Sequence, residues 1–130
     1  MFVCTGNRDR SPTAEALFRN TDGFEVKSAG VASNANTRIT KESIQWADLI
    51  FVMEKWHKQE LISIDKVAQD KIRVLNIPDI FHNGDSELKQ LFETKMQPYL
   101  KRMKNENKKS PMSNLPEEQN NGTVRFADDV

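Results

Sequence analysis

The residues of this chain that could do chemistry are concentrated in one short segment, Cys4-Thr5-Gly6-Asn7-Arg8-Asp9-Arg10-Ser11, which follows an apolar start. Cys4 is the only cysteine in the sequence, and five residues separate it from Arg10. A loop of this length can surround one tetrahedral oxyanion, with N–H groups pointing inward, a thiolate beneath it and a guanidinium forking over two oxygens. The segment therefore predicts transfer of a phosphoryl group from an ester to the cysteine sulfur.

The neighbours of Cys4 favour the thiolate, which is the nucleophilic form of cysteine. The loop opens a helix, so unpaired N–H groups and the positive end of the helix dipole face the sulfur. Arg10 adds a permanent positive charge, and the Ser11 hydroxyl can donate a hydrogen bond to the sulfur. Gly6 and Asn7 tolerate the backbone angles of a tight anion-binding loop. We predict that six loop residues bind phosphate beside Cys4 and Arg10: Thr5, Gly6, Asn7, Arg8, Asp9 and Ser11.

A structural role for Cys4 is the alternative, because a lone cysteine is usually a small buried hydrophobe. The spacing from Cys4 to Arg10 is a weak signal by itself. The glycine and asparagine within the loop, and the Ser11-Pro12 pair and helix after it, favour the functional interpretation.

The segments Phe2–Asn7 and Arg10–Glu15 resemble the signature of the low-molecular-weight protein-tyrosine phosphatases, and most closely that of their short bacterial members. The resemblance extends to the region of residue 100 through four shorter segments: 28–30, 47–54, 78–81 and 85–88. It implies hydrolysis of a phosphomonoester, most of all phosphotyrosine, through a phosphocysteine on Cys4. Arg10 and the loop amides would bind the phosphate, and no metal or cofactor would be needed.

The resemblance also implies a general acid, which the chemistry requires because the leaving oxygen must be protonated. The family usually writes this loop as Asp-Pro followed by an aromatic residue, whereas Pro78 precedes Asp79 here. Asp79 is the predicted acid, and a turn-forming aspartate is the alternative. Asp85 matches a further acidic position but stands before a helix, where an N-cap is the better interpretation. Phe81 either walls the substrate cleft or belongs to the core.

Two loop residues depart from the family pattern. Asp9 stands where many members carry a second cysteine, so a protective disulfide is absent. Its carboxylate opposes thiolate and phosphate unless it points away or pairs with Arg8, and on that basis Asp9→Ala should raise turnover. Arg8 replaces an apolar residue at the mouth, and it either attracts acidic or doubly phosphorylated substrates or pairs with Asp9.

Alternating strand and helix patterns predict an α/β fold, a doubly wound four-stranded parallel sheet with helices on both faces and a truncated first strand. Only two residues precede Val3, so this strand should lack ladder bonds. Pro98 should kink the last helix or end its regular part. The expected strands are 1–3, 24–28, 49–53 and 72–75, and the expected helices are 11–20, 40–46, 55–62 and 86–104.

One phosphatase-like domain is expected over residues 1–104, followed by a polar, disordered tail over 105–130. The 19 basic and 19 acidic residues cancel, so neither nucleic acid nor a membrane is an expected partner. The expected partner is a phosphorylated protein or a small phosphomonoester, and the protein is expected to be a monomer.

No apolar run could span a bilayer, no secretory leader is visible, and one cysteine suits a reducing compartment, so we expect a cytoplasmic location. The two histidines stand apart, with His57 expected on a helix surface and His82 in a solvated loop.

Three other functions remain open. A non-catalytic module that binds phosphate or phosphotyrosine would keep the loop without efficient catalysis, and Asp9, the altered acid loop and the short first strand favour it. An arsenate-reductase-like oxyanion enzyme uses a similar loop but relays electrons through additional cysteines. A phosphoserine-specific phosphatase of polymerase tails shares the loop, but its usual downstream features are not evident.

Overall fold

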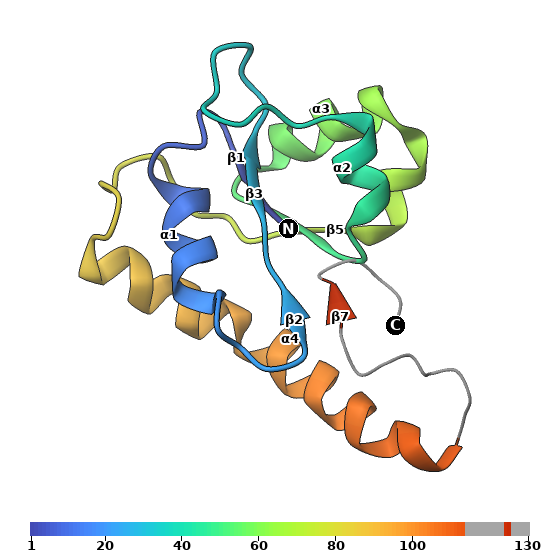
Figure 1. The fold of residues 1–130 in the computed structure, drawn as a ribbon. Coiled ribbons are helices and arrows are strands. Elements are labelled where there is room, and N and C mark those ends of the chain that lie inside the picture. The colour runs from blue at the N-terminus through green and yellow to red at the C-terminus, as the bar shows by residue number, and fades with distance from the viewer. Residues whose placement is uncertain (114–123, 126–130) are drawn as a thin grey trace.

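A parallel sheet between two helical layers forms the body of the protein, as Figure 1 shows. This computed structural model describes the backbone of residues 1–113 and 124–125 and the side chains of residues 1–102. The strand order is β3-β1-β4-β5, with every neighbouring pair parallel. The four strands each contain three residues: β1 (Phe2–Cys4), β3 (Ser28–Gly30), β4 (Ile50–Val52) and β5 (Ile72–Val74).

The helices divide between the two faces of the sheet, as predicted. One face carries α1 (Arg10–Phe18) and α4 (Ser86–Ser113), whose apolar residues share a single core cluster. The other face carries α2 (Lys41–Trp46), α3 (Lys55–Ile64) and the 3-10 helix η1 (Lys66–Lys71), which share a second cluster.

The alternation of side chains along β1 produces these two cores. Phe2 and Cys4 belong to the cluster under α1 and α4, whereas Met1 and Val3 belong to the cluster under α2 and α3. Successive residues of a strand point to opposite faces, and every residue of β1 and β4 is buried. This is the burial that a continuous apolar run predicts for a strand covered on both faces.

The inner position of β1 places Cys4 at the carboxyl edge of the sheet. Phe2 is in register with Ser28 on one side and with Phe51 on the other. The carbonyl of Cys4 accepts a hydrogen bond of 3.0 Å from the N–H of Val31. The first strand is short, as predicted, and its neighbours in the sheet have the same length.

Two elements in the first half of the chain differ from the sequence-based expectation, whereas α2 agrees with it. The segment 24–28, which was expected to form one strand, contributes to two strands. Strand β2 (Phe24–Glu25) pairs with β7 (Val124–Arg125), and β3 begins only at Ser28. Helix α2 follows its predicted cap, where Thr40 Oγ1 accepts from the Ser43 N–H at 3.1 Å. The 3-10 helix η1 was not predicted. It begins after Asp65, whose carboxylate accepts from the Val67 N–H.

Helix α4 is longer than predicted, because it passes Pro98 and ends only at Ser113. Residues 105–113, the start of the tail that was expected to be disordered, belong to this helix, and the disorder of the tail stays a prediction. The rest of the expected tail, apart from β7, lies outside the described residues, so the domain boundary at residue 104 stays a prediction. Over the part of the chain that the structure describes, no helix has the length and hydrophobicity needed to cross a membrane.

Gly30 is where β3 passes closest to the N-terminal loop. A Cβ atom on this residue would lie 2.6 Å from the carbonyl oxygen of Thr5 and 2.9 Å from the nitrogen of Asn7. Both are backbone atoms, so Gly30→Ala must displace the loop and should lower the free energy of unfolding by about 1–3 kcal/mol. Urea denaturation measures this change.

The matched control for this prediction is Gly6→Ala. A Cβ atom there would meet only the Arg8 side chain, at 3.7 Å or more, so it should cost much less stability. Equal stability of the Gly30 and Gly6 variants would contradict the close approach.

Candidate active site

Cys4 lies under the first turn of α1 at the start of the loop. The residue is 3% exposed, and its Sγ atom is 3.1 Å from the hydroxyl oxygen of Ser11. The sulfur therefore faces a hydroxyl at the start of a helix, although Cys4 also belongs to the apolar cluster of that face. Helix starts carry unpaired N–H groups and favour negative charge.

Asn7 holds the loop in its open form. Its φ of 53° is in the left-handed region that the sequence predicted for this part of the loop. Its side-chain nitrogen donates to the hydroxyls of Ser11 and Ser28, at 2.9 Å each, and its side-chain oxygen accepts from the Thr37 N–H. Ser28 donates in turn to the carboxylate of Glu15. This network joins α1, β3 and the loop after β3 to the residue that contacts the sulfur.

Arg10 is a buried cation with four partners. Its side chain is 1% exposed, and Nη1 lies 2.6 Å from Glu54 Oε2 and 2.7 Å from the carbonyl oxygen of Ile77. Its Nη2 donates to Thr5 Oγ1, and its Nε lies 3.7 Å from Asp79 Oδ1. A charge removed from water needs such partners, because an unpaired buried charge is very costly.

The structure brings Asp79, the predicted acid, to Arg10, the predicted phosphate-binding arginine. The Asp79 side chain is 64% exposed, so it stands at the surface opening beside the guanidinium. Phe81 packs against the cluster that contains Cys4, which places it at the edge of the core. Asp85 accepts from the Glu87 N–H at 2.8 Å at the start of α4, so the N-cap interpretation is confirmed.

His57 was expected on the surface, and that prediction is wrong because the side chain is fully buried. Its Nδ1 accepts from the Glu54 N–H at 3.0 Å, so the ring hydrogen is on Nε2, which donates to Thr5 Oγ1 at 2.9 Å. Burial and the charge of Arg10 lower the pKa of His57 to about 4, against the opposing effect of Glu54 and Asp79. A neutral ring therefore supports the loop at neutral pH.

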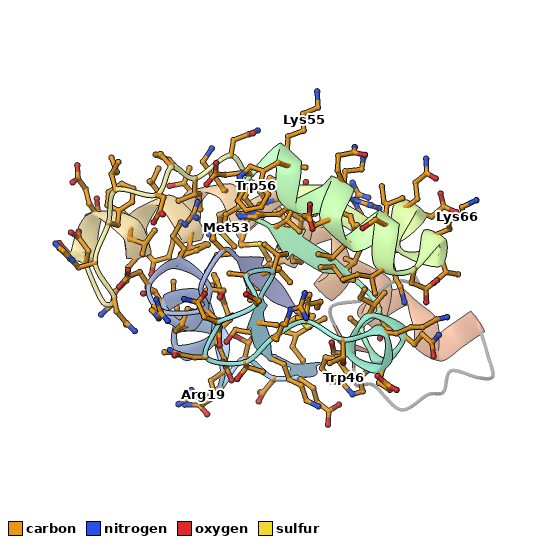
Figure 2. The ribbon with its side chains drawn as sticks, turned by 90° about the horizontal axis from the view of Figure 1, so that it is seen from above. Arg19, Trp46, Met53, Lys55, Trp56 and Lys66 are labelled. Atoms are coloured by element: carbon orange, nitrogen blue, oxygen red, sulfur yellow. The ribbon has the colours of Figure 1, made fainter. Side chains whose placement is uncertain are left out.

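Glu54 was also missed as a site residue. Burial alone would raise the pKa of its carboxyl group, but the hydrogen bond and charge of Arg10, with help from Trp56 and His57, lower it overall. The Trp56 indole N–H donates to Glu54 Oε1 at 3.2 Å, and its ring is partly exposed. Figure 2 shows Trp56 at the start of α3, near Met53. The sequence signal for this cluster was the spacing of Glu54 and His57 around a helix start, which is typical of a capping box.

The two unusual loop residues do not pair with each other. Asp9 Oδ1 accepts from the N–H of Asn83 at 2.9 Å, which turns its carboxylate toward the segment after Asp79. Arg8 is exposed and donates to the carbonyl oxygen of Asn34 at 3.1 Å. Two alternatives were considered for Asp9, and the structure shows the one in which its carboxylate points away from the anion site.

Comparison with known proteins agrees with this fold and loop. A family model described as low molecular weight phosphotyrosine protein phosphatase matches residues 1–47. A protein-arginine-phosphatase of Bacillus subtilis (strain 168) is 33% identical over 102 residues, a match that covers 58% of this chain and 68% of that protein. The protein-arginine-phosphatase of Geobacillus stearothermophilus is 35% identical over 95 residues, covering 55% of this chain and 64% of the relative.

A solved structure extends the comparison to the whole sheet. The tyrosine phosphatase Wzb from Escherichia coli K30, in complex with phosphate, superposes with a TM-score of 0.64 at 26% identity, over 78% of this chain and 94% of that one. The chain belongs to the low molecular weight phosphotyrosine protein phosphatase family, and the predicted α/β fold is confirmed. The match to the Geobacillus protein spans 64% of that relative's length.

The buried histidine predicts a pH dependence of stability. Folding lowers the pKa of His57 from 6.5 to about 4, so between these values the unfolded chain binds a proton that the folded chain does not. The free energy of unfolding should fall as pH drops through this window, by up to ~3 kcal/mol from this group. His57→Gln keeps a neutral hydrogen-bonding side chain and should flatten that part of the curve.

Urea denaturation at a series of pH values compares the two proteins. The control is His82→Gln, since His82 is an exposed loop residue, and its curve should follow the wild type. Parallel wild-type and His57→Gln curves would show that His57 does not titrate in this way.

Proposed function

We propose that this chain hydrolyses phosphotyrosine esters through a phosphocysteine on Cys4. The observation that carries the proposal is the position of Arg10. One buried guanidinium lies at the end of the loop that starts with Cys4, and it stands 3.7 Å from the carboxylate of Asp79. The proposal takes Cys4 as the nucleophile, Arg10 as the phosphate ligand and Asp79 as the acid, and membership of the family supports the same chemistry.

The first step forms a sulfur–phosphorus bond and breaks the ester bond. The Cys4 thiolate attacks phosphorus in line with the leaving oxygen, while Arg10 and the loop N–H groups hold the equatorial oxygens. Asp79 donates its proton to the leaving phenolate oxygen. In the second step a water attacks phosphorus and loses its proton to Asp79. The thiolate leaves with a hydrogen bond from the Ser11 hydroxyl.

An aromatic leaving group suits the surroundings of Arg10. The indole of Trp56 is exposed and donates a hydrogen bond to Glu54, one acidic partner of Arg10. Ile80 is also exposed, and it follows Asp79, the other acidic partner, in the sequence. Exposed apolar groups next to both acidic partners of Arg10 can contact a phenol ring, and aromatic rings stack favourably.

Phosphoarginine is the second candidate substrate, because both curated relatives are named protein-arginine-phosphatase. In phosphoarginine the leaving group is a guanidine that carries positive charge beside the phosphate. Arg8 places a second guanidinium at the loop, and it is exposed. Repulsion between the Arg8 guanidinium and the charged guanidine of phosphoarginine favours phosphotyrosine in this chain.

The covalent scheme predicts the behaviour of two variants on p-nitrophenyl phosphate. Cys4→Ser should lower turnover by more than roughly 10⁴-fold because the nucleophile is lost, yet it should still bind phosphate. Asp79→Asn should lower kcat by roughly 100-fold or more because the leaving oxygen is no longer protonated. Wild-type turnover should resist EDTA and be inhibited by vanadate.

The same assay distinguishes the alternatives. Tight binding of vanadate without release of nitrophenol would identify a non-catalytic phosphate-binding module. Activity that survives Cys4→Ser would refute the phosphocysteine.

The substrate preference can be tested at Arg8. Arg8→Gln removes the exposed charge, and the ratio of phosphotyrosine to phosphoarginine turnover should fall about fivefold, as ~1 kcal/mol of exposed charge repulsion implies. Peptides that differ only in the phosphorylated residue measure this ratio through kcat/KM.

The control is Arg19→Gln, which removes an exposed arginine at the far end of α1 (Figure 2). It should leave the ratio unchanged. A wild-type enzyme that prefers phosphoarginine would reverse the assignment of substrate.

A further inference from the structure

Four hydrogen bonds fasten the segment that carries Asp79 to the N-terminal loop and α1, the longest of them from Thr13 Oγ1 to Asn83 Oδ1 at 3.4 Å. The N–H of Asn83 donates to Asp9 Oδ1, and the Asn83 side-chain nitrogen donates to the carbonyl oxygen of Arg8, each at 2.9 Å. The N–H of Gly84 donates to Thr13 Oγ1, also at 2.9 Å. Asn83 and Gly84, in the segment that carries Asp79, are thus hydrogen-bonded to Arg8, Asp9 and Thr13 of the loop and α1.

The residues between this attachment and the sheet form an arch over Arg10. The chain leaves the sheet edge at Ile77, whose N–H donates to the Met53 carbonyl and whose own carbonyl accepts from Arg10. Two residues of the arch, residues 78–82, are largely exposed, because Ile80 is 73% exposed and Asp79 is 64% exposed, whereas Phe81 packs against the core cluster. The position of the Asp79 carboxylate therefore depends on the Phe81 contact, on Arg10 and on how the two ends of the arch are held.

We propose that Asp9 is a positioning residue for the general acid. Its carboxylate, by accepting the Asn83 N–H, fixes the far end of the arch so that Asp79 stays beside Arg10. The inference rests on the proposed role of Asp79. The proposal also explains why an anion-binding loop contains the Asp9 carboxylate. This charge accepts a hydrogen bond from Asn83 in the neighbouring segment and is directed away from the loop interior.

This proposal reverses the sequence-based expectation for Asp9→Ala. Removal of the acceptor takes away one of the hydrogen bonds that hold the far end of the arch, so the acid spends less time over the leaving oxygen. We expect kcat for phenyl phosphate, whose leaving group needs a proton, to fall roughly tenfold, the factor that corresponds to one hydrogen bond to a charged group. The loss should be smaller for p-nitrophenyl phosphate, whose leaving group depends less on the acid.

Two further variants separate positioning from charge. Asp9→Asn keeps an oxygen that can accept the Asn83 N–H, so it should retain near wild-type kcat on both esters. Asp22→Ala removes an exposed carboxylate near the C-terminal end of α1 and serves as the control for net charge. Phosphate affinity is measured in all three proteins, and Asp22→Ala should leave it unchanged.

A second readout needs no turnover. Amide hydrogen exchange over residues 78–84 should be faster in Asp9→Ala than in the wild type and Asp9→Asn. If the wild type does not hydrolyse either ester, the proposed function fails, and the exchange measurement still decides whether Asp9 holds the arch.

Three results would overturn the proposal. Equal exchange in Asp9→Ala and the wild type would show that the contact holds nothing. Increased turnover in both Asp9→Ala and Asp9→Asn would mean that the charge acts on the phosphate instead. An equal loss of kcat on both esters, accompanied by a lower Tm, would indicate a purely structural role.

Discussion

The burial of the Arg10 charge is the constraint on which the rest of the site depends. A guanidinium that is 1% exposed must be matched by acceptors, and here they come from widely separated parts of the sequence. Glu54 follows β4, the Ile77 carbonyl follows β5, and Thr5 belongs to the loop after β1. Satisfying one cation therefore draws together the ends of three strands, so the ion pair organises the edge of the sheet as well as the charge within it.

The parallel sheet makes this convergence possible. Because β1, β4 and β5 run in the same direction, the segments that follow them emerge at the same edge. Three-residue strands suffice for this purpose because the inner strands β1 and β4 are fully buried between two apolar layers. Cys4 is the last residue of an inner strand, and its position is fixed by neighbours on both sides.

Local signals allowed much of this arrangement to be predicted. The loop from Cys4 to Ser11, the buried run of β4 and the Thr40 cap are short-range patterns, and each was found where expected. His57 was misplaced because its burial depends on Thr5, which is 52 residues away in sequence. The direction of the Asp9 carboxylate was left open for the same reason, since its acceptor role depends on Asn83, 74 residues further along. Contacts of this range carry no signature in either local segment, whereas helix and strand periods do.

The contact between Asp79 and Arg10 has a consequence for anion binding. On the proposed mechanism, an incoming phosphate oxygen would compete for the guanidinium edge that lies 3.7 Å from this carboxylate. An anion from solution would then have to displace a carboxylate that is tethered to the protein itself. A dianionic phosphate ester would do so more readily than a singly charged anion, and the displaced carboxylate would remain close to the ester bond that the proposed reaction breaks.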